Sequence, residues 1–181
     1  MPHAQGKIAL PQMTPGTRRS IAFHRFGKVG ARPKAYLQAA IHANELPGAM
    51  ALHHLMPLLA AADRARRIQG EIVVVPTVNP IGLAQLVGNN HLGRYELLGR
   101  DNFNRQWHDL SGAIAERIGK RLGHDAAANV AAIRKAALAA LAALRPTNEL
   151  QALRASMMKL SVDADIVLDL QDGRAEVTVE R

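Results

Sequence analysis

The 181-residue sequence contains no cysteine and few aromatic residues, which make up 3% of the chain. The missing cysteine excludes disulfides and cysteine-ligated zinc, so any metal site must use His, Asp or Glu. The scarcity of aromatic residues leaves little to stack on nucleobases, which disfavours binding to single-stranded nucleic acid. One domain is expected for a chain of this length.

Long apolar runs are also missing. The first residues lack the apolar core of a signal peptide, and no run of about 18 consecutive apolar residues occurs. We therefore expect no membrane span and no membrane partner. Together with the missing cysteine, this favours a cytoplasmic protein.

Charge of one sign is in excess, since the formal net charge is +8. Such an excess suits nucleic acid or an anionic substrate. The basic residues are dispersed along the chain, however, as at Arg18-Arg19, Arg64 and Arg117, and the later groups fall on expected helix surfaces. We expect a small anionic substrate and no nucleic acid. A basic nucleic-acid-binding module is a third alternative, and its affinity would fall steeply with salt.

The order of the expected elements indicates an α/β domain with a mixed, largely parallel central sheet flanked by helices. Residues 1–16, with three prolines, are expected to form an irregular arm. Buried or half-buried strands are expected at 20–26, 35–41, 71–76 and 165–170. Helices are expected at 48–67, 112–122, 125–144 and 147–160. Within the first helix, Pro57 predicts a kink or a break.

Two metal-binding residue types follow the strand at 35–41. His42 ends the apolar run, and Glu45 comes three residues later, just before Pro47-Gly48. An imidazole nitrogen and a carboxylate oxygen both suit Zn²⁺, and sites in open α/β sheets gather at the carboxyl ends of strands. The alternative is a surface histidine followed by a glutamate at a helix start.

Residues 83–110 are polar and expected to be irregular. A loop this long inside a compact domain is usually functional or disordered. This one is rich in groups that bind carboxylates, including Arg94, Arg100, Asn104 and Arg105.

Four stretches, in this order, resemble the succinylglutamate desuccinylase/aspartoacylase family of zinc carboxypeptidase-like hydrolases. They are the segments His42 to Gly48, Asn79 to Gly82, Gly99 to Arg105, and Val167 to Leu170. The resemblance covers nearly all of residues 20–171 and matches the N-terminal half of the family. It implies zinc-dependent hydrolysis of an amide or ester bond in a small N-acylated amino acid.

The family's site residues carry over by position. The resemblance implies that His42 and Glu45 are the first two zinc ligands, and that Asn104 and Arg105 bind the substrate carboxylate and help to polarise the scissile carbonyl. Arg94, which precedes Tyr95, matches a further substrate-binding arginine, with Arg100 as the competing residue. A loop turn with a solvated arginine is the alternative for Asn104-Arg105.

One departure concerns the third zinc ligand. Where the family carries a histidine after the Val-Leu-Asp-Leu strand, this chain has Gln171, whose carbonyl oxygen is a poor zinc ligand. Asp169 and Asp172 are possible substitutes.

A second departure concerns the length of the chain. The family's general base is expected beyond residue 181, and Glu176 and Glu180 lie too close to the ligand strand to serve as that base. Residues 171–181 are expected to resemble the family less. A change of reading frame near codon 170, a natural truncation or an engineered shortening would each explain this.

These departures keep open an inactive fragment or pseudoenzyme lacking the third ligand and the general base. They also predict that the strand at 165–170 presents an open edge, which favours self-association.

Overall fold

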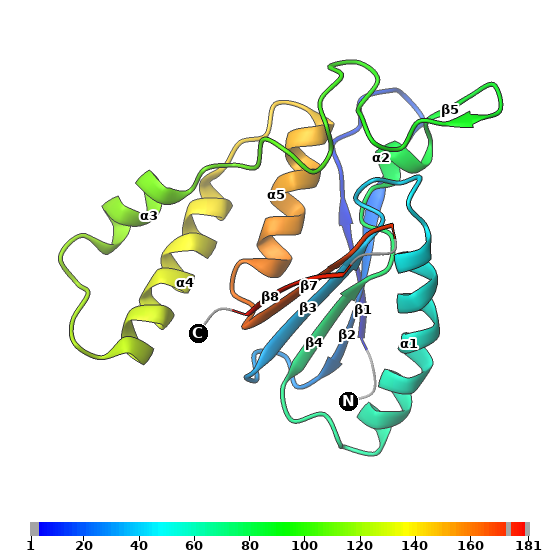
Figure 1. The fold of residues 1–181 in the computed structure, drawn as a ribbon. Coiled ribbons are helices and arrows are strands. Elements are labelled where there is room, and N and C mark those ends of the chain that lie inside the picture. The colour runs from blue at the N-terminus through cyan, green and yellow to red at the C-terminus, as the bar shows by residue number, and fades with distance from the viewer. Residues whose placement is uncertain (1–3, 173–174, 180–181) are drawn as a thin grey trace.

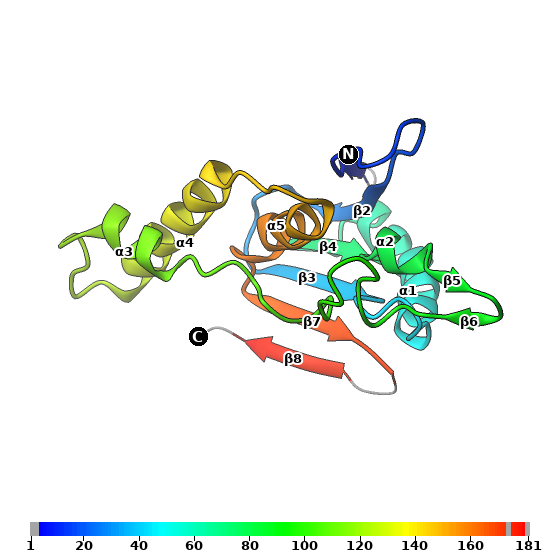
Figure 2. The same ribbon diagram turned by 90° about the horizontal axis from the view of Figure 1, so that it is seen from above.

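A six-stranded mixed sheet forms the centre of the computed structural model, which describes residues 4–172 and 175–179 (Figures 1 and 2). Its strands, in spatial order, are β1 (Ala4–Ala9), β2 (Ser20–Gly27), β4 (Glu71–Val75), β3 (Lys34–Ala39), β7 (Ile166–Leu170) and β8 (Ala175–Val179). The central strands β4, β3 and β7 are parallel, and every other pairing is antiparallel. The predicted mixed sheet is confirmed, with its parallel part confined to the centre.

The central strands form because β-branched residues fill both faces of the sheet. Val73, Val74 and Val75 of β4 are fully buried. Val73 and Val75 pack on the face covered by α5 (Glu149–Ser161), whereas Val74 packs on the face covered by α1 (Pro47–Arg64). Figure 2 shows the two helices on opposite sides of the sheet.

Helix α1 starts with Pro47 in its first turn, where a missing N–H costs nothing. It runs through Pro57 without a break, so the predicted break is wrong. Both Pro57 and His53, whose carbonyl loses its helical partner, are exposed, and water can bind that carbonyl instead.

The remaining long helices, α3 (Ser111–Ile118) and α4 (Ala126–Ala143), pack together beside α5 (Figure 1). Asp125 caps α4 as predicted, by accepting a hydrogen bond from the Ala128 N–H. The cap of α5 is Asn148 rather than Thr147.

Among the described residues, α4 alone is long and apolar enough to cross a membrane by length and composition. This is weak evidence, because core helices pass the same test. Ala140 and Leu141 of α4 pack with Leu110 in a hydrophobic cluster, and Arg134 pairs with Asp165 beside the sheet. The expectation of no membrane partner stays a prediction.

The two edges of the sheet differ from expectation. Part of the predicted irregular arm is β1, which pairs with β2 from Ala4 to Ala9. Strand β8 pairs with β7, so β7 is not the open edge that was predicted. The alternation Val177-Thr178-Val179 is typical of such a strand. Self-association stays a prediction and now concerns β8.

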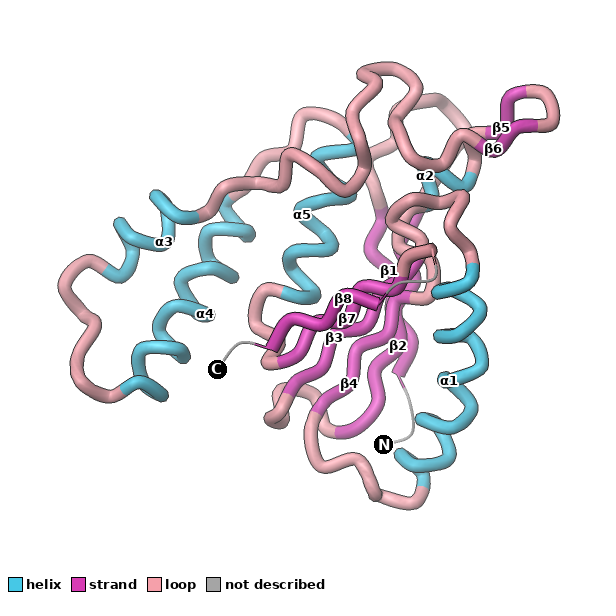
Figure 3. The backbone as a smooth tube through the Cα atoms, in the orientation of Figure 1, coloured by secondary structure: helices cyan, strands magenta, loops and turns pink. Residues whose placement is uncertain are grey.

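The long polar segment is largely irregular, as predicted. The short helix α2 (Pro80–Leu83) leads into it, and its regular structure is a small hairpin of β5 (Leu86–Val87) and β6 (Asn90–His91) (Figure 3). The segment returns to the carboxyl end of β3, where the Ala43 N–H donates to the Gly93 carbonyl at 2.8 Å. The segment thereby lies beside His42.

Candidate functional site

The turn that carries His42 begins with an unusual backbone conformation. Ala40, directly after β3, has φ 58° and is buried. This left-handed conformation is uncommon for a residue other than glycine. The Asn79 side chain holds the turn, because its amide donates to the Ile41 carbonyl at 2.7 Å. The Asn79-Pro-Ile-Gly motif thus has a structural role beside the site.

His42 and Glu45 meet as the sequence predicts. His42 is 3% exposed and Glu45 6%, and the Glu45 N–H closes the turn by donating to the His42 carbonyl at 2.9 Å. Nδ1 of His42 lies 3.2 Å from Oε1 of Glu45. This places two metal-binding atoms side by side in a buried position.

Asn102 determines which ring nitrogen of His42 carries the proton. Nε2 of His42 lies 3.0 Å from Oδ1 of Asn102. The Asn104 N–H donates to the same Oδ1 at 2.8 Å, so this atom is an acceptor. His42 must therefore donate through Nε2–H, and a ring with this one proton has its lone pair on Nδ1.

That lone pair faces a carboxylate oxygen, which is also an acceptor. Two acceptors this close are stable only with a cation between them, either a proton or a metal ion. Two ligands of a tetrahedral zinc, each about 2.0–2.2 Å from the metal, are about 3.4 Å apart. The 3.2 Å separation therefore fits a shared metal ion.

Arg94 reaches the same carboxylate. Its Nη2 donates to Oε1 of Glu45 at 2.7 Å, and its side chain is 48% exposed. Gly93 permits this approach, because a Cβ there would lie 2.3 Å from the Asn44 nitrogen. The structure therefore places Arg94, and not its competitor Arg100, in contact with Glu45.

Asn104 and Arg105 lie in the same loop but do not join this cluster. The backbone of Asn104 contacts Asn102, and the exposed Arg105 guanidinium donates to the Asn104 carbonyl at 2.7 Å. Arg100 lies at an exposed turn with φ 57°. The roles of Asn104 and Arg105 in substrate binding remain predictions.

No described residue takes the place of the third zinc ligand that the family resemblance implies. The Gln171 amide donates to Oδ2 of Asp169 at 2.8 Å. The backbone N–H of Asp172 lies 3.3 Å from Oε2 of Glu45. Among the side chains that the structure describes, those of residues 4–172, no three His, Asp or Glu residues gather as a metal site. The side chain of Glu176, and all of Glu180, fall outside the described part.

The sequence analysis missed two residues, Asn102 and Arg154. Asn102 lies inside the Gly99–Arg105 motif, two residues before Asn104. Arg154 shares the apolar face of α5 with Leu150 and Met157, and it is only 3% exposed. An arginine at a core-facing position was the available signal.

Solved structures share this architecture. A family protein from Shewanella amazonensis SB2B has a TM-score of 0.80 and 27% identity over 93% of this chain. A protein of the same family from Shewanella frigidimarina NCIMB 400 has a TM-score of 0.79 and 24% identity over 94%. The ectoine utilization protein EutE (DoeB) from Ruegeria pomeroyi, at 20% identity and a TM-score of 0.54, shares the fold alone.

This chain spans about half the length of its solved relatives, 46% for either Shewanella protein. A search of curated proteins finds no match. The sequence profile of the succinylglutamate desuccinylase/aspartoacylase catalytic domain matches residues 31–180. The match reaches past residue 170 to residue 180, and the expectation that residues 171–181 resemble the family less stays a prediction. With most of the chain matched, it belongs to the succinylglutamate desuccinylase/aspartoacylase family of hydrolases.

Proposed function

We propose that this chain provides the N-terminal part of a zinc-dependent active site that hydrolyses an amide or ester bond of a small N-acylated amino acid. The observation that carries the proposal is the 3.2 Å approach of His42 Nδ1 to Glu45 Oε1, two acceptors that need a cation between them. Family membership supports hydrolysis as the reaction.

His42 and Glu45 are the residues that would hold the zinc. Bound there, the metal would polarise the scissile carbonyl and lower the pKa of a coordinated water toward neutrality. The third ligand and the general base are assigned to no described residue.

Arg94 is the residue in contact with the metal-binding pair that can recognise an anion. Its guanidinium presents a planar fork of donors that suits a carboxylate, and nearly half of its side chain is open to solvent. In this proposal it orients the substrate carboxylate beside Glu45, with Asn104 and Arg105 as further groups of the same loop. In this proposal the substrate is a small anion, and no nucleic acid is expected to bind.

Zinc titration into the metal-free chain tests this assignment by calorimetry. We expect one zinc per chain, and we expect His42→Gln or Glu45→Gln to remove that binding. His53→Gln is the matched control, because His53 is exposed on α1 away from the site. Equal zinc binding by His42→Gln and wild type would contradict the proposal.

A second candidate is an inactive member of the family. Gln171 at the position of the third ligand favours it, since the carbonyl oxygen of a glutamine is a poor zinc ligand. Hydrolysis of N-succinyl and N-acetyl amino acids by the zinc-loaded chain separates the two candidates. Zinc binding without turnover identifies the inactive member.

A further inference from the structure

Arg154 places a guanidinium group in the hydrophobic core. It lies in the middle of α5, is 3% exposed, and is flanked on its helix by the buried residues Leu153 and Met157. Burial lowers the pKa of Arg154, and the nearby charge of Asp101 opposes this change. Burying a charge costs several kcal/mol unless the group is well paired, so this position needs a physical reason.

The guanidinium has one described hydrogen bond, from Nη2 to the backbone carbonyl of Asn102 at 2.9 Å. Its Nε is buried and has no hydrogen-bond partner among the described residues. Asn102 is the same residue whose side-chain oxygen accepts from Nε2 of His42. A chain of contacts therefore runs from α5, through the polar loop, to the candidate metal ligand.

Contacts other than that of Arg154 also hold the loop in its overall shape. Tyr95 and Asn102 form a backbone bridge, and the Glu96 N–H donates to the Asp101 carbonyl at 2.8 Å. Phe103 is fully buried and anchors the loop in the core. The contact of Arg154 therefore has a local effect: it fixes the position of Asn102 relative to the His42 ring.

We propose that Arg154 is a positioning residue that acts through Asn102 to keep His42 hydrogen-bonded through Nε2–H, so that Nδ1 is directed at Glu45. The inference deepens the proposed function and rests on it for its purpose. Groups that orient metal-binding histidines in this way typically change metal affinity 10- to 100-fold when removed. Arg154 lies one contact further from the ring, so we expect roughly a tenfold effect.

The test compares Arg154→Met with wild type by two measurements on the full chain. The first is a ¹⁵N–¹H correlation spectrum of the metal-free protein at pH 8, with the His42 signals assigned from His42→Gln. The wild type should show Nε2 fully protonated by its hydrogen bond to Asn102, and Arg154→Met should show a mixture in which part of the population has lost the proton on Nε2. The second is zinc affinity, which should fall about tenfold.

Arg134→Met is the matched control. Arg134 is the other arginine with a buried Nε that lacks a described partner, but it pairs with Asp165 beside α4 and not with the site. Both variants lose a largely buried guanidinium and gain the same side chain. Arg134→Met should keep the wild-type protonation of Nε2 and the wild-type zinc affinity even if it unfolds more easily.

Asn102→Ala directly tests the contact between Asn102 and His42. It also tests the proposed role of Asn102 if Arg154→Met does not fold. It removes Oδ1 and leaves the buried guanidinium in place, so part of the population should also lose the proton on Nε2. A fully protonated Nε2 in folded Arg154→Met, or in Asn102→Ala, would overturn the proposal. If the wild type binds no zinc, the proposed function fails, and the measurement of Nε2 protonation still decides the role of Arg154.

Discussion

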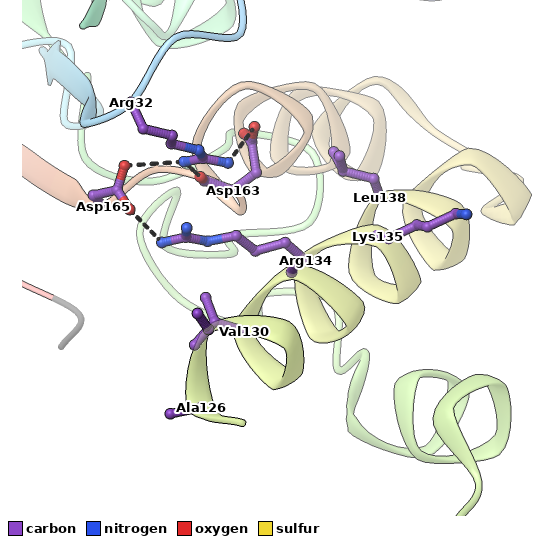
Figure 4. Close-up of a pocket in the computed structure, with 10 residues that line it drawn as sticks. Arg32, Ala126, Val130, Arg134, Lys135, Leu138, Asp163 and Asp165 are labelled. Carbon is purple, nitrogen blue, oxygen red and sulfur yellow. Dashed lines mark hydrogen bonds and ion pairs between the residues drawn. The ribbon is translucent and has the colours of Figure 1, made fainter. Parts of the chain in front are cut away.

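The two ends of the central sheet carry charge in opposite ways. At the amino ends of β3 and β7, Asp163 pairs with Lys34 and Arg32, and Asp165 pairs with Arg32 and Arg134. Figure 4 shows the pairs that Arg32 and Arg134 form with the two carboxylates. Each of these carboxylates is matched by cations of the chain itself. At the carboxyl end, Glu45 faces the lone pair of a histidine.

We infer that the charged residues at the amino end stabilise the fold, whereas those at the carboxyl end are arranged to bind a ligand. The amino-end network is complete without any further ion. At the carboxyl end, the half-exposed Arg94 is the one side-chain cation with a described contact to Glu45, and it does not fill the space between His42 and Glu45. The account therefore expects metal at one end only, and the following changes test that contrast.

The largest expected effect is on zinc affinity in Gln171→His. An imidazole at this position would supply the donor that the described residues lack. We expect zinc to bind at least about 100-fold more tightly, because a direct ligand should outweigh an outer residue, whose loss costs 10- to 100-fold. Competition with a chelating dye measures this. An affinity equal to wild type would show that position 171 does not face the metal.

Lys34→Met should break the amino-end network. The Lys34 side chain is 6% exposed and pairs with Asp163, so its removal leaves a largely buried carboxylate with only Arg32. We expect the free energy of unfolding in urea to fall by about 2 kcal/mol, with zinc affinity unchanged. Arg32→Met is the control, because a pair at a 41% exposed side chain is worth about 1 kcal/mol or less. A loss of zinc binding in Lys34→Met would contradict the separation of the two ends.

Lowering the pH should reduce the stability of the fold by protonating Asp165, at the amino end of the central sheet. Burial raises the pKa of Asp165, but hydrogen bonds from the Lys34 N–H, Arg32 and Arg134 outweigh it and hold the pKa below its ordinary value. A lowered pKa in the folded state adds stability above the unfolded value, about pH 4, and this stability is lost as pH falls further.

Asp165→Asn should therefore cost about 1 kcal/mol at pH 7 and show a weaker loss of stability below pH 4 than wild type. Denaturant unfolding at a series of pH values measures both effects. Asp125→Asn is the control, because asparagine also caps a helix. Parallel pH curves for Asp165→Asn and wild type would show that Asp165 does not contribute in this way.

The smallest effect is expected for Arg94→Gln. The guanidinium competes with a metal ion for Oε1 of Glu45, so its removal should tighten zinc binding. The gain should not exceed about fivefold, since a half-exposed ion pair is worth about 1 kcal/mol or less. Weaker zinc binding in this variant would mean that Arg94 supports the metal site instead of competing with it.

Local patterns in the sequence predict much of the fold. The β-branched runs of β4 and β7 form buried strands, and the spacing of His42 and Glu45 brings them together within one turn. Strand β8 was not predicted, although the alternation Val177-Thr178-Val179 is visible in the sequence. The break at Pro57 was wrong because exposure, which sequence does not reveal, lets water replace the lost hydrogen bond.

The contacts that complete the candidate site could not be predicted, because they join distant parts of the chain. Asn102 lies 60 residues from His42, and Arg154 lies 52 residues from Asn102. An arginine on an apolar helix face indicates a buried charge, but it does not indicate which residue pairs with that charge. The antiparallel edges of the sheet likewise depend on pairings that no local pattern specifies.

The central claim is that a metal ion binds between His42 and Glu45, and zinc-edge anomalous diffraction from crystals grown with one equivalent of zinc tests it most directly. The account predicts a single anomalous peak within bonding distance of His42 Nδ1 and Glu45 Oε1. A peak elsewhere, or none at this position, would contradict it and would leave Glu45 paired with a protonated histidine.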